Sequence, residues 1–252
     1  MKYGAYHTHL LVGAAVLFIG TAVQAETFEG PAVKIGDGEA KAIVRTGANG
    51  EASAISIVFT PGMLEGLPAA DHSHPDVPFT LRMPTSGPKT PVNHVVINWN
   101  AHGHQPARIY DVPHFDFHFY LVDEEHQRKI SFTDDKASGD PSQQPPAELL
   151  PAGYKVPPGT AVSNMGVHAI NVTGPEFQGK PFTTTFIYGY YDKKLTFVEP
   201  MVTVDYLRSR PSFREQIPTP QKYTFEGRYP AAYAIRYDAG ADRYEISLEE
   251  FK

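Results

Sequence analysis

The sequence predicts an all-β fold, a sandwich or a barrel-like jelly roll, with one or two short helices and one long Pro-rich loop. Three observations favour this class. Short runs of β-branched and aromatic residues recur along the chain. The 23 prolines and 21 glycines are scattered between these runs, where turns are needed. The run at residues 113–120 alternates strictly between apolar and polar side chains, as a β-strand with two different faces does.

The first 25 residues carry the features of a secretory signal peptide. Lys2 provides a weakly positive start, and residues 10–23 form an apolar run that is short for a membrane span. Small residues then end at Ala25, where we expect cleavage. This predicts a periplasmic or secreted protein with a single β-rich domain at residues 26–252. An uncleaved N-terminal anchor is the alternative, and no later stretch has the apolar length of a membrane helix.

Composition limits the partners and the ligands. Without residues 1–25 the chain has 21 basic and 28 acidic residues, hence a formal charge of −7, which argues against nucleic acid or an anionic membrane as partner. The chain has no cysteine, so a metal site must use histidine and carboxylate. Without disulfides, an exported protein depends on its core, on metal or on assembly into a homo-oligomer.

The first half of the chain predicts a hairpin, further strands and one helix. Residues 40–46 and 54–60 flank an Asn-Gly turn, which is a strong hairpin signal. Residues 77–83 and 93–100 are also strand-like. Residues 123–129 are charged, with acids near the start and bases near the end, which favours a short exposed helix.

The second half begins with a Pro-rich excursion at residues 134–158, either a lid or a flexible connector. A strand at 166–172 and a hairpin with arms 183–191 and 195–203 follow. Pro200 predicts that the second arm is an edge strand or bulged. A short helix is expected after residue 204, and strands close the chain.

Residues 113–120 are the most informative stretch. On a strand, His114, Asp116 and His118 share one face, and the intervening phenylalanines share the other. One face is suited to a core and the other to a site. A helical reading would bring residues 114 and 118 together, but the strict alternation favours the strand. The alternative to a site is a polar stripe on a half-exposed strand.

We identify His114, His118 and His168 as the principal candidate metal ligands and Glu199 as a fourth ligand or a base. Imidazole is the commonest metal ligand, and three protein ligands with an open position are typical of a catalytic zinc site. Asp116 is the candidate catalytic residue, as a general base, an orienter of a histidine, or a ligand. Glu199 stands alone among apolar residues and needs a partner if it is buried.

Strand geometry restricts this set. Residues four apart on a strand are roughly 13 Å apart at Cα, too far for His114 and His118 to reach one ion on a flat strand. Either a bulge or strong twist brings them together, or the two histidines have different roles.

Two His-x-His pairs are weaker candidates. His102 and His104 lie in a turn before Pro106, where ordinary loop histidines are the favoured interpretation. His72 and His74 lie in a similar loop. Either pair could contribute to the rim of a pocket.

The chain resembles an uncharacterised family of exported bacterial proteins. The resemblance rests on Trp99-Asn100-Ala101-His102-Gly103-His104-Gln105-Pro106, then Tyr110, then Pro113-His114-Phe115-Asp116-Phe117-His118-Phe119-Tyr120, then Met165-Gly166-Val167-His168. It implies a secreted β-rich protein and makes oligomeric assembly plausible, but it carries no activity. A weaker likeness to cupins is one of chemistry and fold class, and its ligand spacing does not match here.

Two functional hypotheses follow. The first is an exported protein that binds a divalent metal, zinc in first place, and that could act as a hydrolase or lyase on a small molecule if a coordination position is open. The alternative is a non-catalytic envelope protein that self-assembles or binds a ligand, with the His/Asp stripe as a structural network.

Overall fold

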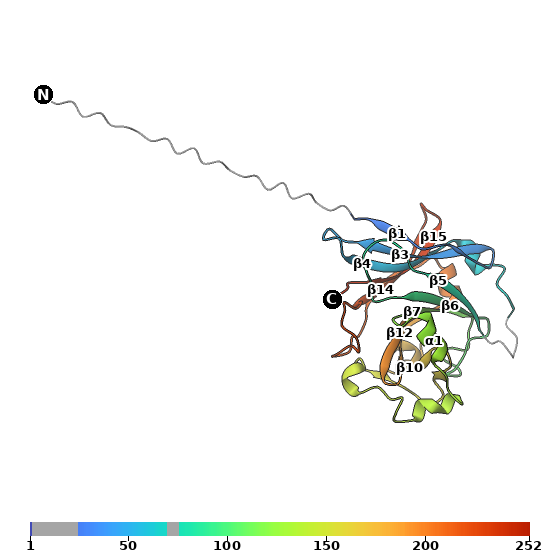
Figure 1. Cartoon of the computed structure of the whole chain (residues 1–252). Helices are drawn as coiled ribbons and strands as arrows, with labels where there is room; N and C mark the ends of the chain where they lie inside the picture. Colours follow the sequence, from blue (N-terminus) through green and yellow to red (C-terminus); the bar gives the residue numbers. More distant parts are fainter. Residues whose placement is uncertain (2–24, 70–75) are drawn as a thin grey trace.

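Two antiparallel β-sheets face each other in this protein, whose computed structural model describes Met1, residues 25–69 and residues 76–252 (Figure 1). The predicted all-β sandwich is confirmed. The expected signal peptide, apart from its two end residues, and the pair His72 and His74 lie outside the described residues.

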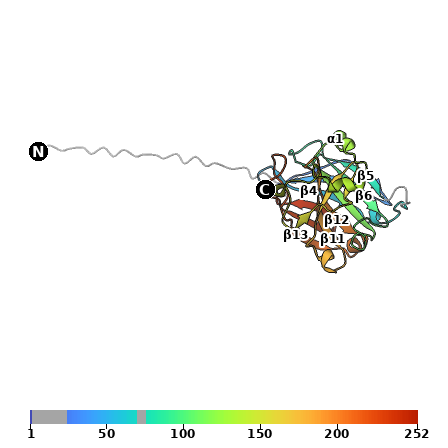
Figure 2. The ribbon, with the colours of Figure 1, turned by 90° about the horizontal axis from the view of Figure 1, so that it is seen from below.

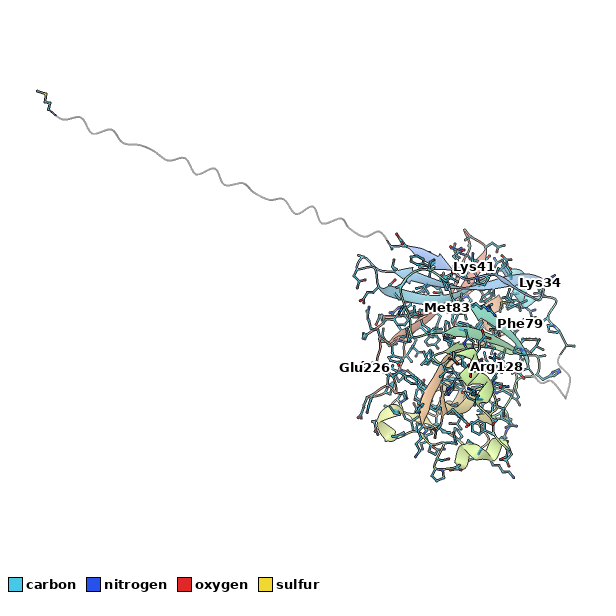
Figure 3. The ribbon with its side chains drawn as sticks, in the orientation of Figure 1. Lys34, Lys41, Phe79, Met83, Arg128 and Glu226 are labelled. Carbon is cyan, nitrogen blue, oxygen red and sulfur yellow. The ribbon has the colours of Figure 1, made fainter. Side chains whose placement is uncertain are left out.

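The first sheet has seven strands among these residues. Its strands are, in order of pairing, β1 (Thr27–Glu29), β3 (Gly38–Thr46), β4 (Ala52–Phe59), β15 (Arg243–Glu249), β14 (Ala232–Asp238) and β13 (Ser212–Gln216), with β2 (Val33–Ile35) also paired to β3. Its outer face carries a network of ion pairs, including Arg45 with Glu245 and Arg236 with Glu249. Figure 3 labels Lys34 and Lys41 on this sheet. A charged sheet face of this kind is stable in contact with solvent.

The second sheet has eight strands in the described part of the chain. They are β5 (Val77–Arg82), β6 (His94–Asn100), β7 (His114–Tyr120), β12 (Lys194–Thr203), β11 (Thr184–Tyr191), β10 (Gly166–Asn171) and β8 (Tyr154–Lys155) in order of pairing, with β9 (Ala161–Val162) also paired to β10. Figure 2 shows β5, β6, β12 and β11 following one another across the molecule. The register of β6 and β7 runs without a shift from His94↔Tyr120 to Asn100↔His114, so β7 has no bulge against β6.

The main core lies between the two sheets. Phe115, Phe117 and Phe119 point into it and are fully buried. The Phe117 ring stacks on Phe59 of the opposite sheet at a centroid distance of 6.1 Å. Phe79 packs against the edge of this core, between the sheets (Figure 3). The phenylalanines of β7 therefore share the core-facing side of the strand, as their alternation predicts.

The other face of the eight-stranded sheet is also covered. A second apolar cluster includes Tyr120 and Phe197 from the sheet, with Tyr110 and Phe182 from loops laid over it. The segment between β7 and β10, green to yellow in Figure 1, forms the outermost layer on this side. Its helices are α1 (Glu124–Lys129), η2 (Asp135–Gly139) and η3 (Ala147–Leu149), and η4 (Pro175–Gln178) follows β10. The loops and α1 on this face form a third layer, whereas Leu149 and Leu150 of the Pro-rich excursion pack against the main core.

Local predictions have mixed outcomes. The exposed helix expected at 123–129 is α1, capped by the Asp123 side chain, and the helix expected after residue 204 is α2 (Val204–Arg208). A further 3-10 turn, η1, spans Pro61–Leu64. Pro200 marks neither an edge strand nor a bulge, because β12 lies between β7 and β11 and its register shift against β11 lies between Gly189 and Tyr190. No described helix is long and apolar enough to cross a membrane.

Candidate metal centre

The polar residues of β7 lie under the loop layer, on the covered outer face of the eight-stranded sheet. His114 and His118 are 0% and 1% exposed, and Asp116 is 4% exposed. Two groups of potential ligand atoms meet here, each with its atoms within 4.8 Å of one another. We call them the His118 group (His118, His168, Glu199) and the Asp116 group (His104, His114, Asp116).

Three strands of the eight-stranded sheet build the His118 group, with β11 lying between β12 and β10. His118 comes from β7, Glu199 from β12 and His168 from β10, and all three side chains lie on the outer face. The Nε2 atom of His118 lies 3.5 Å from Oε2 of Glu199. His168 donates from Nδ1 to the carbonyl oxygen of Thr160 at 2.9 Å, which leaves the lone pair on its Nε2.

Phe197 fixes the two imidazoles of this group. Its ring centroid lies 4.7 Å from that of His118 and 5.2 Å from that of His168. Gly189 stands opposite Phe197 on β11, and a Cβ at residue 189 would lie 2.0 Å from the Phe197 ring. Glycine is therefore required there for the ring to lie across the sheet and contact both histidines.

The His118 group is held in a neutral state by burial. Burial lowers the pKa of His118 to about 3 and that of His168 to about 4. Burial, reinforced by the negative charge of Asp116, raises the pKa of Glu199 well above its ordinary value. At neutral pH the two imidazoles are thus deprotonated, as metal ligands must be, and burial favours the protonated form of the Glu199 carboxyl group.

The Asp116 group joins β7 to the loop at residues 101–113. This loop connects the paired strands β6 and β7, so it returns close to His114. Gly103 has φ = 69°, and a Cβ there would lie 2.1 Å from the carbonyl oxygen of Tyr110. The loop closes tightly at this glycine and places His104 over Asp116, with Nε2 3.3 Å from Oδ2.

Each side chain of the Asp116 group has a partner behind it. His114 donates from Nδ1 to the carbonyl oxygen of Val112 at 2.7 Å, and His104 donates from Nδ1 to that of Gln105 at 2.7 Å. Asn100 donates from Nδ2 to Oδ2 of Asp116 at 2.7 Å. These contacts orient the Nε2 atoms toward the carboxylate.

The Asp116 group is ionic. Burial opposes the charge of Asp116, but the nearby imidazoles of His114 and His104 hold the pKa of this carboxyl well below its ordinary value. Burial also opposes the charge of His104, but the carboxylate of Asp116 raises the pKa of this imidazole overall. Asp116 and His118 are only two residues apart on β7. They nevertheless belong to groups of opposite electrostatic character.

Buried polar atoms without hydrogen-bond partners concentrate in these groups. Within residues 25–69 and 76–252 there are six such side-chain atoms, and five of them are Nε2 of His114, Oδ1 of Asp116, Nδ1 and Nε2 of His118, and Oε2 of Glu199. Unpaired buried polar atoms are rare in folded proteins, because each loses its hydration without replacement. Such a concentration points to a missing common partner.

A cavity of about 250 Å³ adjoins both groups. His104 and Asp116 line it from one group and His168 from the other. The remaining wall is largely apolar and includes Tyr110, Val162, Met165, Ile170 and Ile187. The volume equals about eight waters at roughly 30 Å³ each, which suits a small molecule.

The structure divides the residues predicted from the sequence. It brings together His118, His168 and Glu199, but His114 belongs to the other group with Asp116. The bulge that could have joined His114 to His118 is absent from the pairing of β6 with β7, and the two histidines have separate surroundings. Whether any of these residues binds a metal stays a prediction.

His104 has a larger role in the structure than its sequence pattern indicates. It was interpreted as an ordinary loop histidine, whereas its Nε2 atom lies against Asp116. The available signal was topological, because a short loop between antiparallel neighbours returns its side chains to the start of the next strand. Its companion His102 is exposed and belongs to neither group.

Comparison with known proteins yields one partial match. Residues 47–99 match the model of a family described as TTHB210-like, hypothetical protein TTHB210. Neither the curated proteins nor the solved structures provide a match. The match supports similarity to an uncharacterised family, and it ends before β7, so the signature at residues 113–120 and the likeness to cupins gain no support from it.

Proposed function

We propose that this protein is an exported divalent-metal-binding protein, zinc in first place, with the ion held by His118, His168 and Glu199. The observation that carries the proposal is the set of unpaired buried atoms in the His118 group: both ring nitrogens of His118 and Oε2 of Glu199. A cation is a partner that Nε2 of His118 and Oε2 of Glu199, which lie 3.5 Å apart, could share.

The donor set fits zinc. Two imidazoles and one carboxylate are a known ligand combination for this ion, with an open fourth position in catalytic sites. Two ligand atoms about 2.1 Å from a tetrahedral ion are about 3.4 Å apart. The 3.5 Å between His118 Nε2 and Glu199 Oε2 meets this spacing, and the widest separation in the group, at most 4.8 Å, needs only a small inward movement.

Proton chemistry also favours loading at neutral pH. His118 and His168 are already deprotonated, so only the carboxyl group of Glu199 has to release a proton when a metal binds. Phe197 holds both imidazole rings in place, which reduces the entropy lost on binding.

The adjoining cavity supports action on a small molecule. His168 lines it, so a ligand in the cavity would lie beside the proposed ion. A bound divalent ion would supply Lewis acidity, which hydrolase or lyase chemistry on a small molecule requires. In the alternative, a self-assembling or ligand-binding envelope protein, the same residues form only a structural network.

Metal analysis of the purified protein tests the proposal. We expect the His118→Ala variant to contain one zinc ion per chain fewer than the wild type. His126→Ala, which removes an exposed histidine of α1, is the matched control and should keep the wild-type content. Glu199→Gln, nearly identical in shape, should weaken zinc binding without unfolding the protein. Equal zinc content in all four proteins would overturn the proposal and favour the structural network.

A further inference from the structure

The Asp116 group has an electrostatic problem of its own. His114 uses Nδ1 to donate to the Val112 carbonyl, so in the neutral ring Nε2 carries a lone pair. That atom lies 3.1 Å from Oδ1 of Asp116, and both atoms are buried without a hydrogen-bond partner. Two electron pairs that face each other in a buried place repel unless a proton or a cation lies between them.

A cation explains the arrangement better than a proton on His114. A proton would satisfy only the His114–Asp116 pair, whereas three side chains converge here. His104 also directs Nε2 toward the carboxylate, because its Nδ1 atom donates to the Gln105 carbonyl. Support of each ligand from behind by a carbonyl or an amide is a recurring property of metal sites.

The donor set defines the kind of ion. Two imidazoles and one carboxylate on one side of an ion leave its other positions open, and this combination binds divalent first-row transition ions. The side chain of His104 is 37% exposed, and both His104 and Asp116 line the cavity. The open side therefore faces the cavity, whereas His118 and Glu199 of the other group are not among its lining residues.

We propose that His104, His114 and Asp116 form a second divalent-metal site, whose open side receives an oxygen atom of a small, mainly apolar molecule bound in the cavity. Asp116 and His118 are about 7 Å apart at Cα, being two residues apart on a strand. The two groups have no residue in common, so the two sites are separate and can be emptied one at a time.

Cobalt stoichiometry tests the second site. Metal-free protein, saturated with Co²⁺ and passed through a desalting column, should carry two ions per chain. His104→Ala should carry one, and His102→Ala, which removes the exposed neighbour, should carry two. His118→Ala should also carry one ion. Because His104→Ala and His118→Ala each remove a ligand of a different group, each variant tests one of the two sites.

The visible spectrum separates a metal site from an ion pair. His104→Gln keeps a polar side chain of similar length. It serves as a control for the possibility that His104→Ala loses metal because it misfolds. If His104→Ala and His104→Gln keep the wild-type cobalt content and spectrum, the Asp116 group is an ion pair and the proposal is overturned, whatever His118→Ala shows.

The open side is tested with isobutyrate, which is small, branched and ends in a carboxylate. Isobutyrate should change the Co²⁺ spectrum of the wild type and of His118→Ala, in which only the second site is loaded. It should leave His104→Ala unchanged. No change in either of the first two proteins would overturn the assignment of an open side that faces the cavity.

Discussion

The two histidine–acid groups on β7 use the same kinds of side chain and have opposite electrostatics. In the His118 group, burial dominates, so the pKa values of both imidazoles fall and that of Glu199 rises. In the Asp116 group, attraction between charges dominates, so the pKa of Asp116 falls and that of His104 rises. Burial favours neutral side chains in the His118 group, which meets the cavity only through His168, whereas the ionic Asp116 group meets it through His104 and Asp116.

The difference shows that surroundings decide what a residue pattern means. A His-x-Asp-x-His stripe places its members on one face, but the partners come from other elements. Glu199 and His168 reach His118 from β12 and β10 of the same sheet, whereas Asn100 reaches Asp116 from the end of β6 and His104 from the loop that follows. We expect the neutral group to respond mainly to metal and the ionic group to contribute stability without it.

The largest expected effect is on zinc-dependent stability. Free zinc at about 1,000 times the dissociation constant of the His118 group should stabilise the folded protein by about 4 kcal/mol through that site. His118→Ala should lose this contribution, and His126→Ala should keep it. Denaturant unfolding with and without a chelator measures both. Equal zinc-dependent stabilisation of the two variants would contradict the different roles of these histidines.

The next effect compares the acids in metal-free protein. Asp116→Asn removes a charge that is paired with His104 and bonded to Asn100, and should cost about 2–3 kcal/mol. The exposure of His104 keeps the cost at the lower end of the range for buried pairs. Glu199→Gln replaces a carboxyl that is already neutral and should change the unfolding free energy by less than about 1 kcal/mol. Urea unfolding in the presence of a chelator measures the stability loss of each variant. Equal losses in Asp116→Asn and Glu199→Gln would contradict the different electrostatics of the two groups.

Gly189→Ala should disturb only the His118 group. The new methyl group would overlap the Phe197 ring, which must then move against His118 and His168. We expect a loss of about 2 kcal/mol in stability and about 10-fold weaker zinc binding at this group. Gly139→Ala is the control, because a Cβ there meets no atom within 4 Å. Unchanged zinc affinity in Gly189→Ala would exclude the positioning role of Phe197.

The smallest effect is the pH dependence of metal-free stability. Between pH 4.5 and 6.5 the unfolded chain gains protons on His118 and His168, whose pKa values in the folded protein are about 3 and about 4. The raised pKa of folded Glu199 acts in the opposite direction, because it favours proton binding by the folded state. Together with His94, whose pKa burial also lowers, these histidines make the unfolded state bind more protons, so stability should rise with pH across this window.

Two variants sharpen the pH experiment. Glu199→Gln removes the opposing contribution of Glu199, so the rise of stability with pH should become steeper in the same window. Above pH 6.5 the raised pKa of His104 should make stability fall with rising pH, and His104→Ala should abolish that fall. Unfolding curves in chelator at several pH values measure the slopes. Equal slopes for the wild type and Glu199→Gln would show that Glu199 is ionised in the folded state.

The sequence predicted the local pattern of β7 well, because strand alternation is set by the backbone. Phe115, Phe117 and Phe119 fill the core as expected, and strand rise correctly warned that His114 and His118 need separate partners. The same local reasoning failed at Pro200, because a missing N–H is tolerated where the ladder between β12 and β7 is interrupted. Pairing of these strands has partners at Val198 and Met201 but none at the two residues between.

What the sequence could not supply is the third layer. Whether a polar strand face is exposed or buried depends on where residues 101–113 and 121–165 fold, and these loops have no periodic pattern. That placement turns a possible surface stripe into two buried groups and makes His104 a functional candidate. Long-range contacts of this kind depend on tertiary packing, which local propensity does not encode.

The central claim is that His118, His168 and Glu199 bind a divalent ion. The most direct measurement is an anomalous-difference map from a zinc-soaked crystal, collected on both sides of the zinc absorption edge. We predict a peak about 2.1 Å from Nε2 of His118, Nε2 of His168 and a carboxylate oxygen of Glu199. A map with zinc bound elsewhere on the protein and no peak within 3 Å of these atoms would contradict the claim.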